Sequence, residues 1–267
     1  MTLSLTPVAN PAAPLARRNP VAKLGAALLF SLPLIATLDP LTPAIALLIE
    51  LAVLPLFGLR PIVLLRRAWP LLLGAGGILI TMTLFASSRT GTTLVTLGSL
   101  DITTGVLTGA LGLILRVFAV ALPGIIVFAT TDPTDLADAL VQNARVPARF
   151  AIGALAAFRL VPLLADEWRT LTLARRARGI DAGRNPVAKL RLFASTAFAL
   201  LVGALRRGGR LATAMDARGF DSGRPRTFAR RQNFTFGDVA LLVVAALVSG
   251  AALTTAIVSG FFHPILG

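Results

Sequence analysis

The residues of this sequence best placed to do chemistry are two arginines in a repeated motif. Residues 177–184 read Ala-Arg-Gly-Ile-Asp-Ala-Gly-Arg, and residues 217–224 read Ala-Arg-Gly-Phe-Asp-Ser-Gly-Arg. Six of the eight positions are identical at an offset of 40 residues. An arginine keeps its charge and carries five donors in a planar fork, which suits recognition at a protein surface better than proton transfer. The repeat therefore predicts two like binding tips.

Each copy of the motif is expected at the end of a helix. Gly179 and Gly219 stand where a C-cap glycine with positive φ would close a helix. The arginines would then lie in the last helical turn, at exposed tips. Two like tips suit a dimeric partner with two like sockets; a pair of ordinary helix ends is the simpler interpretation. The predicted tip residues are Ala177, Arg178, Gly179, Ala217, Arg218 and Gly219, supported by Asp181, Arg184, Asp221 and Arg224.

Few other groups in the chain are suited to chemistry. The chain has no cysteine, no tyrosine and one histidine, His263, so disulfides and thiolate metal sites are excluded and no metal site or cofactor is predicted. Glu50 and Arg116 lie within apolar stretches, where a charge is a functional hypothesis by default. We expect them to form an intramembrane pair. The alternatives are a structural or snorkelling role and, for Arg116, a contact with a partner subunit.

Long apolar helices must position these residues. Of the 267 residues, 55% are hydrophobic, and the mean hydropathy is +0.80. Only 14% are charged, whereas soluble domains average about 25%. Apolar runs of this length are typical of bilayer spans. The sequence predicts an all-α polytopic membrane protein with about five transmembrane helices, at 24–38, 41–58, 69–86, 103–130 and 237–260.

A strongly basic region separates the fourth predicted span from the fifth. Residues 145–231 hold 18 of the 26 basic residues and 5 of the 12 acidic ones. Apolar stretches at 150–165 and 192–205 are predicted as parts of long helices at the membrane surface, with two additional short spans as the alternative. The chain is thus divided into an N-terminal transmembrane bundle over 1–130, a cytoplasmic region with both tips over 131–236, and a last transmembrane helix over 237–267.

The distribution of basic residues predicts the orientation in the membrane. With a cytoplasmic N-terminus, the outer segments 39–40, 87–102 and 261–267 contain a single basic residue, Arg89. Because basic residues gather in cytoplasmic segments, we expect the N-terminus inside and the C-terminus outside. The first 16 residues do not resemble a signal peptide. The net charge of +14 is attributed to this orientation, and no nucleic-acid partner is predicted.

A second repeat marks two helix starts. Arg-Asn-Pro-Val-Ala-Lys-Leu occurs at 18–24 and again at 184–190. Asn-Pro is a helix-start signal in which proline takes the first helical position. We therefore expect Pro20 and Pro186 to open helices at the cytoplasmic face.

These motifs together resemble the transmembrane T component of energy-coupling-factor transporters. The paired Ala-Arg-Gly tips are similar to that family's signatures, above all Ala-Met-Asp-Ala-Arg-Gly-Phe at 214–220. Asn-Pro-Val-Ala-Lys-Leu at 19–24, Thr-Asp-Pro-Thr-Asp-Leu at 131–136 and Arg-Leu-Val-Pro at 159–162 fit as well. The resemblance extends from about 18 to 260, with Asn19 where the family more often has aspartate.

The resemblance implies a non-catalytic coupling subunit of an ATP-driven importer in a bacterial or archaeal cell membrane. Its expected partners are two cytoplasmic ATP-binding subunits, a small substrate-binding membrane subunit that sets the vitamin or transition-metal ion transported, and the lipid bilayer. Coupling helices are expected at about 134–146, 150–180 and 187–220. The chain has no Gly-x-x-x-x-Gly-Lys-Ser/Thr loop, so another chain must bind the ATP.

Two other function classes are weighed against this one. A self-sufficient secondary transporter would show inverted repeats and broken spans, whereas the arginine repeat lies in the predicted cytoplasmic region. A membrane-embedded enzyme would need clustered catalytic side chains. Only Asp181 and Asp221, with their neighbouring arginines, approach such a cluster, and no nucleophile–base pair is apparent.

Overall fold

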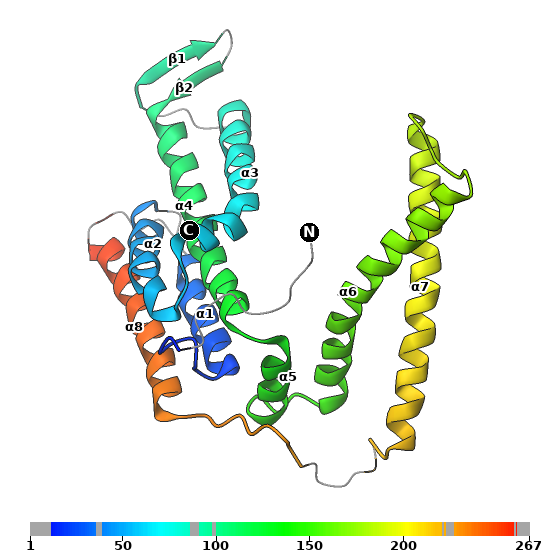
Figure 1. Cartoon of the computed structure of the whole chain (residues 1–267). Helices are drawn as coiled ribbons and strands as arrows, with labels where there is room; N and C mark the ends of the chain where they lie inside the picture. The colour runs from blue at the N-terminus through cyan, green and yellow to red at the C-terminus, as the bar shows by residue number, and fades with distance from the viewer. Residues whose placement is uncertain are drawn as a thin grey trace. The chain divides into compact units, whose positions relative to one another are not determined.

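The computed structural model describes residues 12–35, 39–85, 91–97, 100–220, 222, 227–258 and 260. In these ranges the chain consists of helices and one short hairpin (Figure 1). The elements are α1 (Pro20–Ile35), α2 (Leu41–Val53), η1 (Leu54–Phe57), α3 (Pro61–Phe85), β1 (Thr93–Leu97), β2 (Leu100–Thr103), α4 (Thr104–Thr130), α5 (Pro133–Gln142), α6 (Ala148–Ala177), α7 (Pro186–Ala217) and α8 (Phe236–Val258). The predicted helical membrane fold is confirmed. The antiparallel β1–β2 hairpin was not predicted; it lies in the segment expected as an outer loop.

The chain forms two compact units, which are described separately. The larger unit contains residues 6–145 and 232–267, and residues 146–231 belong to the smaller one. Helix α5 packs on α1 in the larger unit, while α6 and α7 pack on each other in the smaller one. The predicted segments 1–130, 131–236 and 237–267 divide the chain by side of the membrane, which is a different property, and they stay a prediction.

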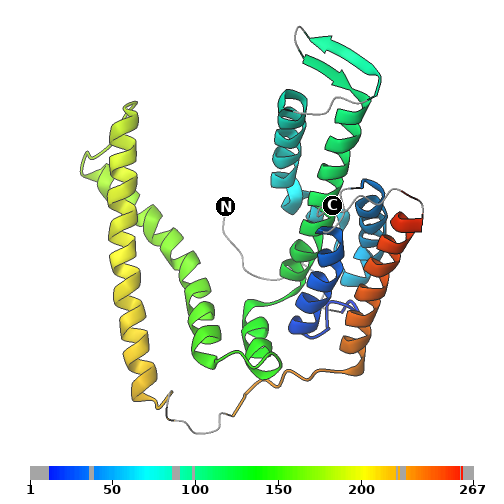
Figure 2. The same ribbon diagram turned by 180° about the vertical axis from the view of Figure 1, so that it is seen from behind.

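The larger unit is built around α4 and α8. Helices α1 and α2 each contact both of them, and α3 packs on α4; Figure 2 shows this bundle from behind. Leu34, Ala46 and Ala119 are fully buried where α1, α2 and α4 meet. A Cβ atom on Gly112 would lie 3.3 Å from the Cβ of Pro40, so glycine allows a close approach there. Small residues at helix contacts are typical of packing in membranes.

Among the residues that the structure describes, five helices are long and apolar enough to cross a membrane by length and composition: 64–85 within α3, then α4, α6, α7 and α8. The expected spans 69–86, 103–130 and 237–260 are thereby confirmed as such helices. The first two expected spans form shorter apolar helices; α1 has 16 residues, or about 24 Å at 1.5 Å per residue. The apolar stretches 150–165 and 192–205 lie inside continuous helices of 30 and 32 residues. Both interpretations of those stretches, surface helix and span, stay predictions.

The repeated heptapeptide opens a helix in both places, as predicted. Helix α1 begins at Pro20 and α7 at Pro186. The Asn19 side chain accepts from the Val21 N–H at 2.9 Å, and the Asn185 side chain accepts from the N–H groups of residues 187 and 188 at 3.0 and 3.3 Å. The two copies differ in burial, because Asn19 is 5% exposed whereas Asn185 lies on the surface.

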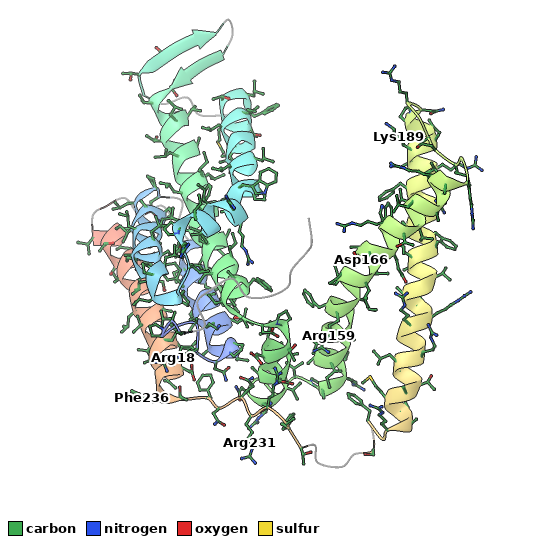
Figure 3. All side chains as sticks on the ribbon, viewed as in Figure 1. Arg18, Arg159, Asp166, Lys189, Arg231 and Phe236 are labelled. Atoms are coloured by element: carbon green, nitrogen blue, oxygen red, sulfur yellow. The ribbon has the colours of Figure 1, made fainter. Side chains whose placement is uncertain are left out.

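A buried carboxylate ties the start of α1 to the start of α8. Asp238, which is 1% exposed, accepts the Asn19 N–H at 3.0 Å. Its other oxygen accepts the N–H and the hydroxyl of Thr235, each at 2.7 Å. Figure 3 labels Arg18 and Phe236 at this end of the larger unit. One side chain thus satisfies donors from two segments more than 200 residues apart in sequence.

A second carboxylate caps the start of α5, just after the connection from α4. The Asp132 side chain accepts the Thr134 N–H at 2.7 Å, and Pro133 occupies the first helical position. Asp132 is therefore the N-cap residue of α5. The helix that the resemblance places at about 134–146 thus begins directly after α4.

Replacing Asp238 by alanine should destabilise the larger unit. Three donors lose their acceptor, and the bond from the Asn19 N–H is buried. We therefore expect a loss of about 1–3 kcal/mol in the free energy of unfolding. Thermal unfolding of the purified chain in detergent would measure it. Thr254→Ala is the control, since Thr254 is exposed and bonds only within its own helix. Equal stability of the two variants would contradict the prediction.

Candidate coupling site at two helix ends

The first tip is the end of α6. Arg178 caps the helix, and Gly179 follows in the left-handed conformation with φ +74°. The Gly179 N–H donates to the Arg176 carbonyl at 2.9 Å, and the Ile180 N–H donates to the Arg175 carbonyl at 3.0 Å. This pair of bonds is the Schellman motif, which satisfies carbonyls that a helix end leaves open.

The second tip, at the end of α7, repeats this geometry. Gly219 has φ +70° and donates its N–H to the Asp216 carbonyl at 2.9 Å. The Phe220 N–H donates to the Met215 carbonyl at 3.1 Å. The predicted C-cap glycines are confirmed. Arg178 and Arg218 are the C-cap residues, directly after the last helical residue of α6 and α7. They were expected within the last helical turn.

Both tips are exposed and lie at opposite ends of α7. All six predicted tip residues are exposed to solvent. The first tip precedes the start of α7 and the second follows its end, so a helix of 32 residues separates them, or about 48 Å at 1.5 Å per residue. The guanidinium groups of Arg178 and Arg218 form no hydrogen bond with the part of the chain that the structure describes. They are therefore open to another molecule.

Arg175 braces the first tip against α7. Its guanidinium donates to the Leu192 carbonyl at 3.1 Å and to the hydroxyls of Ser195 and Thr196 at 2.7 and 2.6 Å. The same residue supplies the carbonyl that closes the tip. The second tip has Met215 at the equivalent position, which cannot make such bonds. Nothing in the sequence distinguishes Arg175 from its neighbour Arg176.

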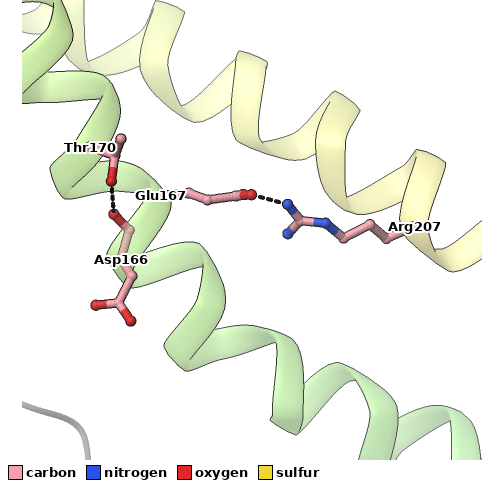
Figure 4. Close-up of polar contacts among 4 residues, drawn as sticks. All are labelled: Asp166, Glu167, Thr170 and Arg207. Atoms are coloured by element: carbon pink, nitrogen blue, oxygen red, sulfur yellow. Dashed lines mark hydrogen bonds and ion pairs between the residues drawn. The ribbon is translucent and has the colours of Figure 1, made fainter.

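Further contacts join α6 to α7 within the smaller unit. The rings of Trp168 and Phe193 lie 5.1 Å apart between centroids, at an interplanar angle of 55°. Glu167 on α6 forms an ion pair with Arg207 on α7 (Figure 4). These contacts make the two long helices one hairpin that carries both tips.

The structure describes two of the four residues predicted to support the tips, Asp181 and Arg184. Asp181 accepts the N–H of Ala182 at 2.8 Å, so it shapes the turn between the two helices. Arg184 is exposed, while Asp221 and Arg224 lie outside the described residues. Asp181 also borders a hollow of about 310 Å³ together with Lys189, which Figure 3 shows at this end of α7. The supporting role of these residues stays a prediction.

Comparison with known proteins decides the family. The cobalt transport protein family CbiQ matches residues 12–228. The chain belongs to the CbiQ family. It is 29% identical to the energy-coupling factor transporter transmembrane protein EcfT of Bacillus selenitireducens over 261 residues, which cover 91% of this chain and 93% of the relative. The EcfT of Limosilactobacillus fermentum is 33% identical over 160 residues, 57% of this chain and 60% of that protein.

The predicted resemblance is thereby confirmed: this CbiQ-family chain is a multi-pass membrane protein of the energy-coupling factor transmembrane type. A third relative has a different length. An ABC transporter ATP-binding protein of Bifidobacterium longum is 28% identical over 249 residues, which cover 87% of this chain but only 31% of that protein.

The expected pair of Glu50 and Arg116 is not formed in this family member. Arg116 on α4 donates to the carbonyl of Ile35, at the end of α1, and interacts electrostatically with Asp39. Both oxygens of Glu50 are buried without a hydrogen-bond partner among the residues described. The sequence places each charge within an apolar run, but it does not show that Arg116 reaches the connection between α1 and α2 instead.

Substituting the cap glycines should weaken the helix ends by conformation alone. Nothing lies within 4 Å of a Cβ added to Gly179, so Gly179→Ala should cost about 1 kcal/mol, the penalty of a side chain at positive φ. Hydrogen exchange of the Ile180 amide, which closes the tip, should accelerate. Gly219→Ala should act likewise on the Phe220 amide.

Gly208 provides the matched control for this prediction. It lies inside α7, and nothing lies within 4 Å of its added Cβ either. Gly208→Ala should stabilise the helix by about 0.5–1 kcal/mol, because alanine favours the helical conformation. Slower exchange in a Gly179→Ala protein would show that the tip does not need a left-handed residue.

Proposed function

We propose that this chain is the coupling subunit of an ATP-driven micronutrient importer, with Arg178 and Arg218 as the residues that engage two cytoplasmic ATP-binding subunits. The observation that carries the proposal is the repetition of one helix end. Two long helices finish in the same Schellman motif, and each presents an exposed arginine without a hydrogen bond to the described residues.

The geometry of α6 and α7 suits the transmission of movement. A helix keeps its length because its hydrogen bonds run along its axis. A displacement applied at an arginine tip is therefore carried through a helix of 30 or 32 residues. Arg175 and the Glu167–Arg207 pair join the two helices, so they would respond as one body.

The proposed ATP-binding partners are supported by the chain's own sequence and by one relative. This chain lacks a phosphate-binding loop of the Gly-x-x-x-x-Gly-Lys-Ser/Thr type. The Bifidobacterium longum protein named for ATP binding contains a segment similar to 87% of this chain. A segment of this kind within a polypeptide of that name supports joint action with an ATPase. The ATPase activity is thus assigned to partner chains.

The proposed substrate-binding membrane subunit would use the apolar surface of the long helices. Large apolar side chains on α6 and α7 are exposed, among them Phe150 at 62%, Leu173 at 64% and Phe198 at 67%. Apolar surface of this extent in one chain is typical of contacts with protein or lipid. The partner would define the transported vitamin or transition-metal ion. The surrounding bilayer would be a bacterial or archaeal cell membrane, with the N-terminus in the cytoplasm.

Reversing the charge of the tips should abolish transport. Arg178→Glu or Arg218→Glu should weaken co-purification of the ATP-binding subunits, since a buried interface arginine contributes about 2 kcal/mol or more. The double variant should be worse than either single one, because each tip has its own socket. Lysine should substitute poorly, as it lacks the planar fork. The measurements are subunit co-purification and substrate uptake by cells.

Arg206→Glu is the matched control for the tip variants. Arg206 is exposed on α7 and carries the same charge, but it lies about 18 Å along the helix from the second tip. It should retain the ATP-binding subunits. Wild-type association and uptake in the double Glu variant would overturn the proposal and leave two ordinary helix ends.

Labelling of introduced cysteines tests the proposed orientation, since the chain has none of its own. Thr92→Cys, before β1, should react with a membrane-impermeant thiol reagent added to intact cells. Ala229→Cys, before α8, should react only after the membrane is opened. Both positions are exposed. The opposite pattern would place the N-terminus outside.

A further inference from the structure

Glu50 is a buried carboxylate in the apolar part of the larger unit. It is 8% exposed, and neither oxygen has a hydrogen-bond partner among the residues described. It lines a cavity of about 130 Å³ between α1, α2, α4 and α8, whose other walls are apolar except for Lys23. Burying a polar group without a partner is unfavourable. A buried carboxylate of this kind therefore requires a physical explanation.

Lys23 is the cationic residue that lines the same cavity as Glu50. It lies in the first turn of α1 and is 3% exposed. Its ammonium group donates to the Thr130 carbonyl at 2.9 Å, to the Thr130 hydroxyl at 3.4 Å and to the Ala16 carbonyl at 3.2 Å. All three acceptors are neutral.

Lys23 also borders a second, polar hollow of about 390 Å³. From that side the carboxylates of Asp135 and Asp238 attract its ammonium group electrostatically. The side chain thus stands between an apolar cavity with one carboxylate and a polar hollow with several. Its present hydrogen bonds hold it to the end of α4 rather than to Glu50.

Two of the three hydrogen bonds that Lys23 donates depend on the connection between α4 and α5. Thr130 is the last residue of α4, and Asp132 caps α5 two residues later. If this connection shifts, the ammonium group loses two of its three acceptors. A lysine has a flexible four-carbon stem and three donors, so it can turn to a new acceptor. In a low-dielectric cavity a carboxylate attracts an ammonium group far more strongly than in water.

We propose that the apolar cavity is an ammonium-binding site, with Glu50 as its carboxylate and the side chain of Lys23 as its occupant. The ammonium group exchanges between Thr130 and Glu50 as the α4–α5 connection moves. This pairing does not depend on the role proposed for the arginine tips. Where α5 responds to a partner subunit, the exchange gives the bundle two alternative arrangements.

A hydrophobic carbodiimide tests the pairing in the purified full-length chain. The reagent adds to the carboxylic acid of Glu50 and forms an O-acylisourea. When the Lys23 amine reaches this group it displaces the urea, and an amide joins the two side chains with the net loss of one water from the protein. Otherwise the acyl group migrates to nitrogen and the whole carbodiimide stays on Glu50. The reaction is irreversible, so it accumulates even a minor arrangement.

The chain suits this experiment because it contains only two lysines, Lys23 and Lys189. Mass spectrometry of the peptides should find an amide between Lys23 and Glu50 in the wild-type chain. The cross-link should be lost in Glu50→Gln. It should also be lost in Lys23→Arg, which keeps the charge but has no reactive amine, and that variant should instead carry the carbodiimide on Glu50.

Three results would overturn the proposal. One is a carbodiimide adduct on wild-type Glu50 with no cross-link, and another is no reaction at Glu50. The third is Glu50 joined to a different amine, such as phosphatidylethanolamine from the membrane. The chain is used without partner subunits, so none of these results bears on the test of the arginine tips.

Discussion

The hydrogen bond from the Ile180 N–H to the Arg175 carbonyl, and its counterpart from Phe220 to Met215, fix where the two longest helices stop. Each bond forms because a glycine directly after the arginine takes a left-handed conformation. The helix therefore ends at one defined residue, and the arginine is the C-cap residue that follows it. Without such a closing bond, the last turn of a helix tends to fray.

The two tips have the same backbone but different support. Arg175 ties the first tip to α7 through three donated bonds, whereas the second tip has Met215 in the corresponding place. The first tip is also part of a tight turn between two packed helices, with Asp181 bonded inside it. Both tips thus expose an arginine at a glycine-closed helix end. Among the described residues, only the first tip is also joined to the neighbouring helix by side-chain hydrogen bonds next to it.

Polar contacts hold one end of the larger unit, and small apolar residues hold its middle. Asp238 joins the starts of α1 and α8, and Lys23 joins α1 to the end of α4. Deeper in the bundle, contact is made by residues such as Ala46 and Ala119. Helices in a bilayer gain little from the hydrophobic effect between them, so close packing and buried hydrogen bonds determine their arrangement. The proposed ammonium-binding site uses Lys23, which makes one of these contacts, and Glu50, which lines the same cavity.

The sequence by itself determined the helical membrane class, the helix starts at Pro20 and Pro186, and the glycine-closed ends at residues 179 and 219. These features are local, since a cap or a glycine turn depends on a few neighbouring residues. Tertiary structure alone decided the β1–β2 hairpin, the bracing by Arg175, and the separation of Glu50 from Arg116. It also decided that one copy of the Arg-Asn-Pro-Val-Ala-Lys-Leu repeat is buried while the other is exposed. Identical residues cap identical helix starts, but burial and partners depend on which helices pack against them, and that is a property of the whole fold.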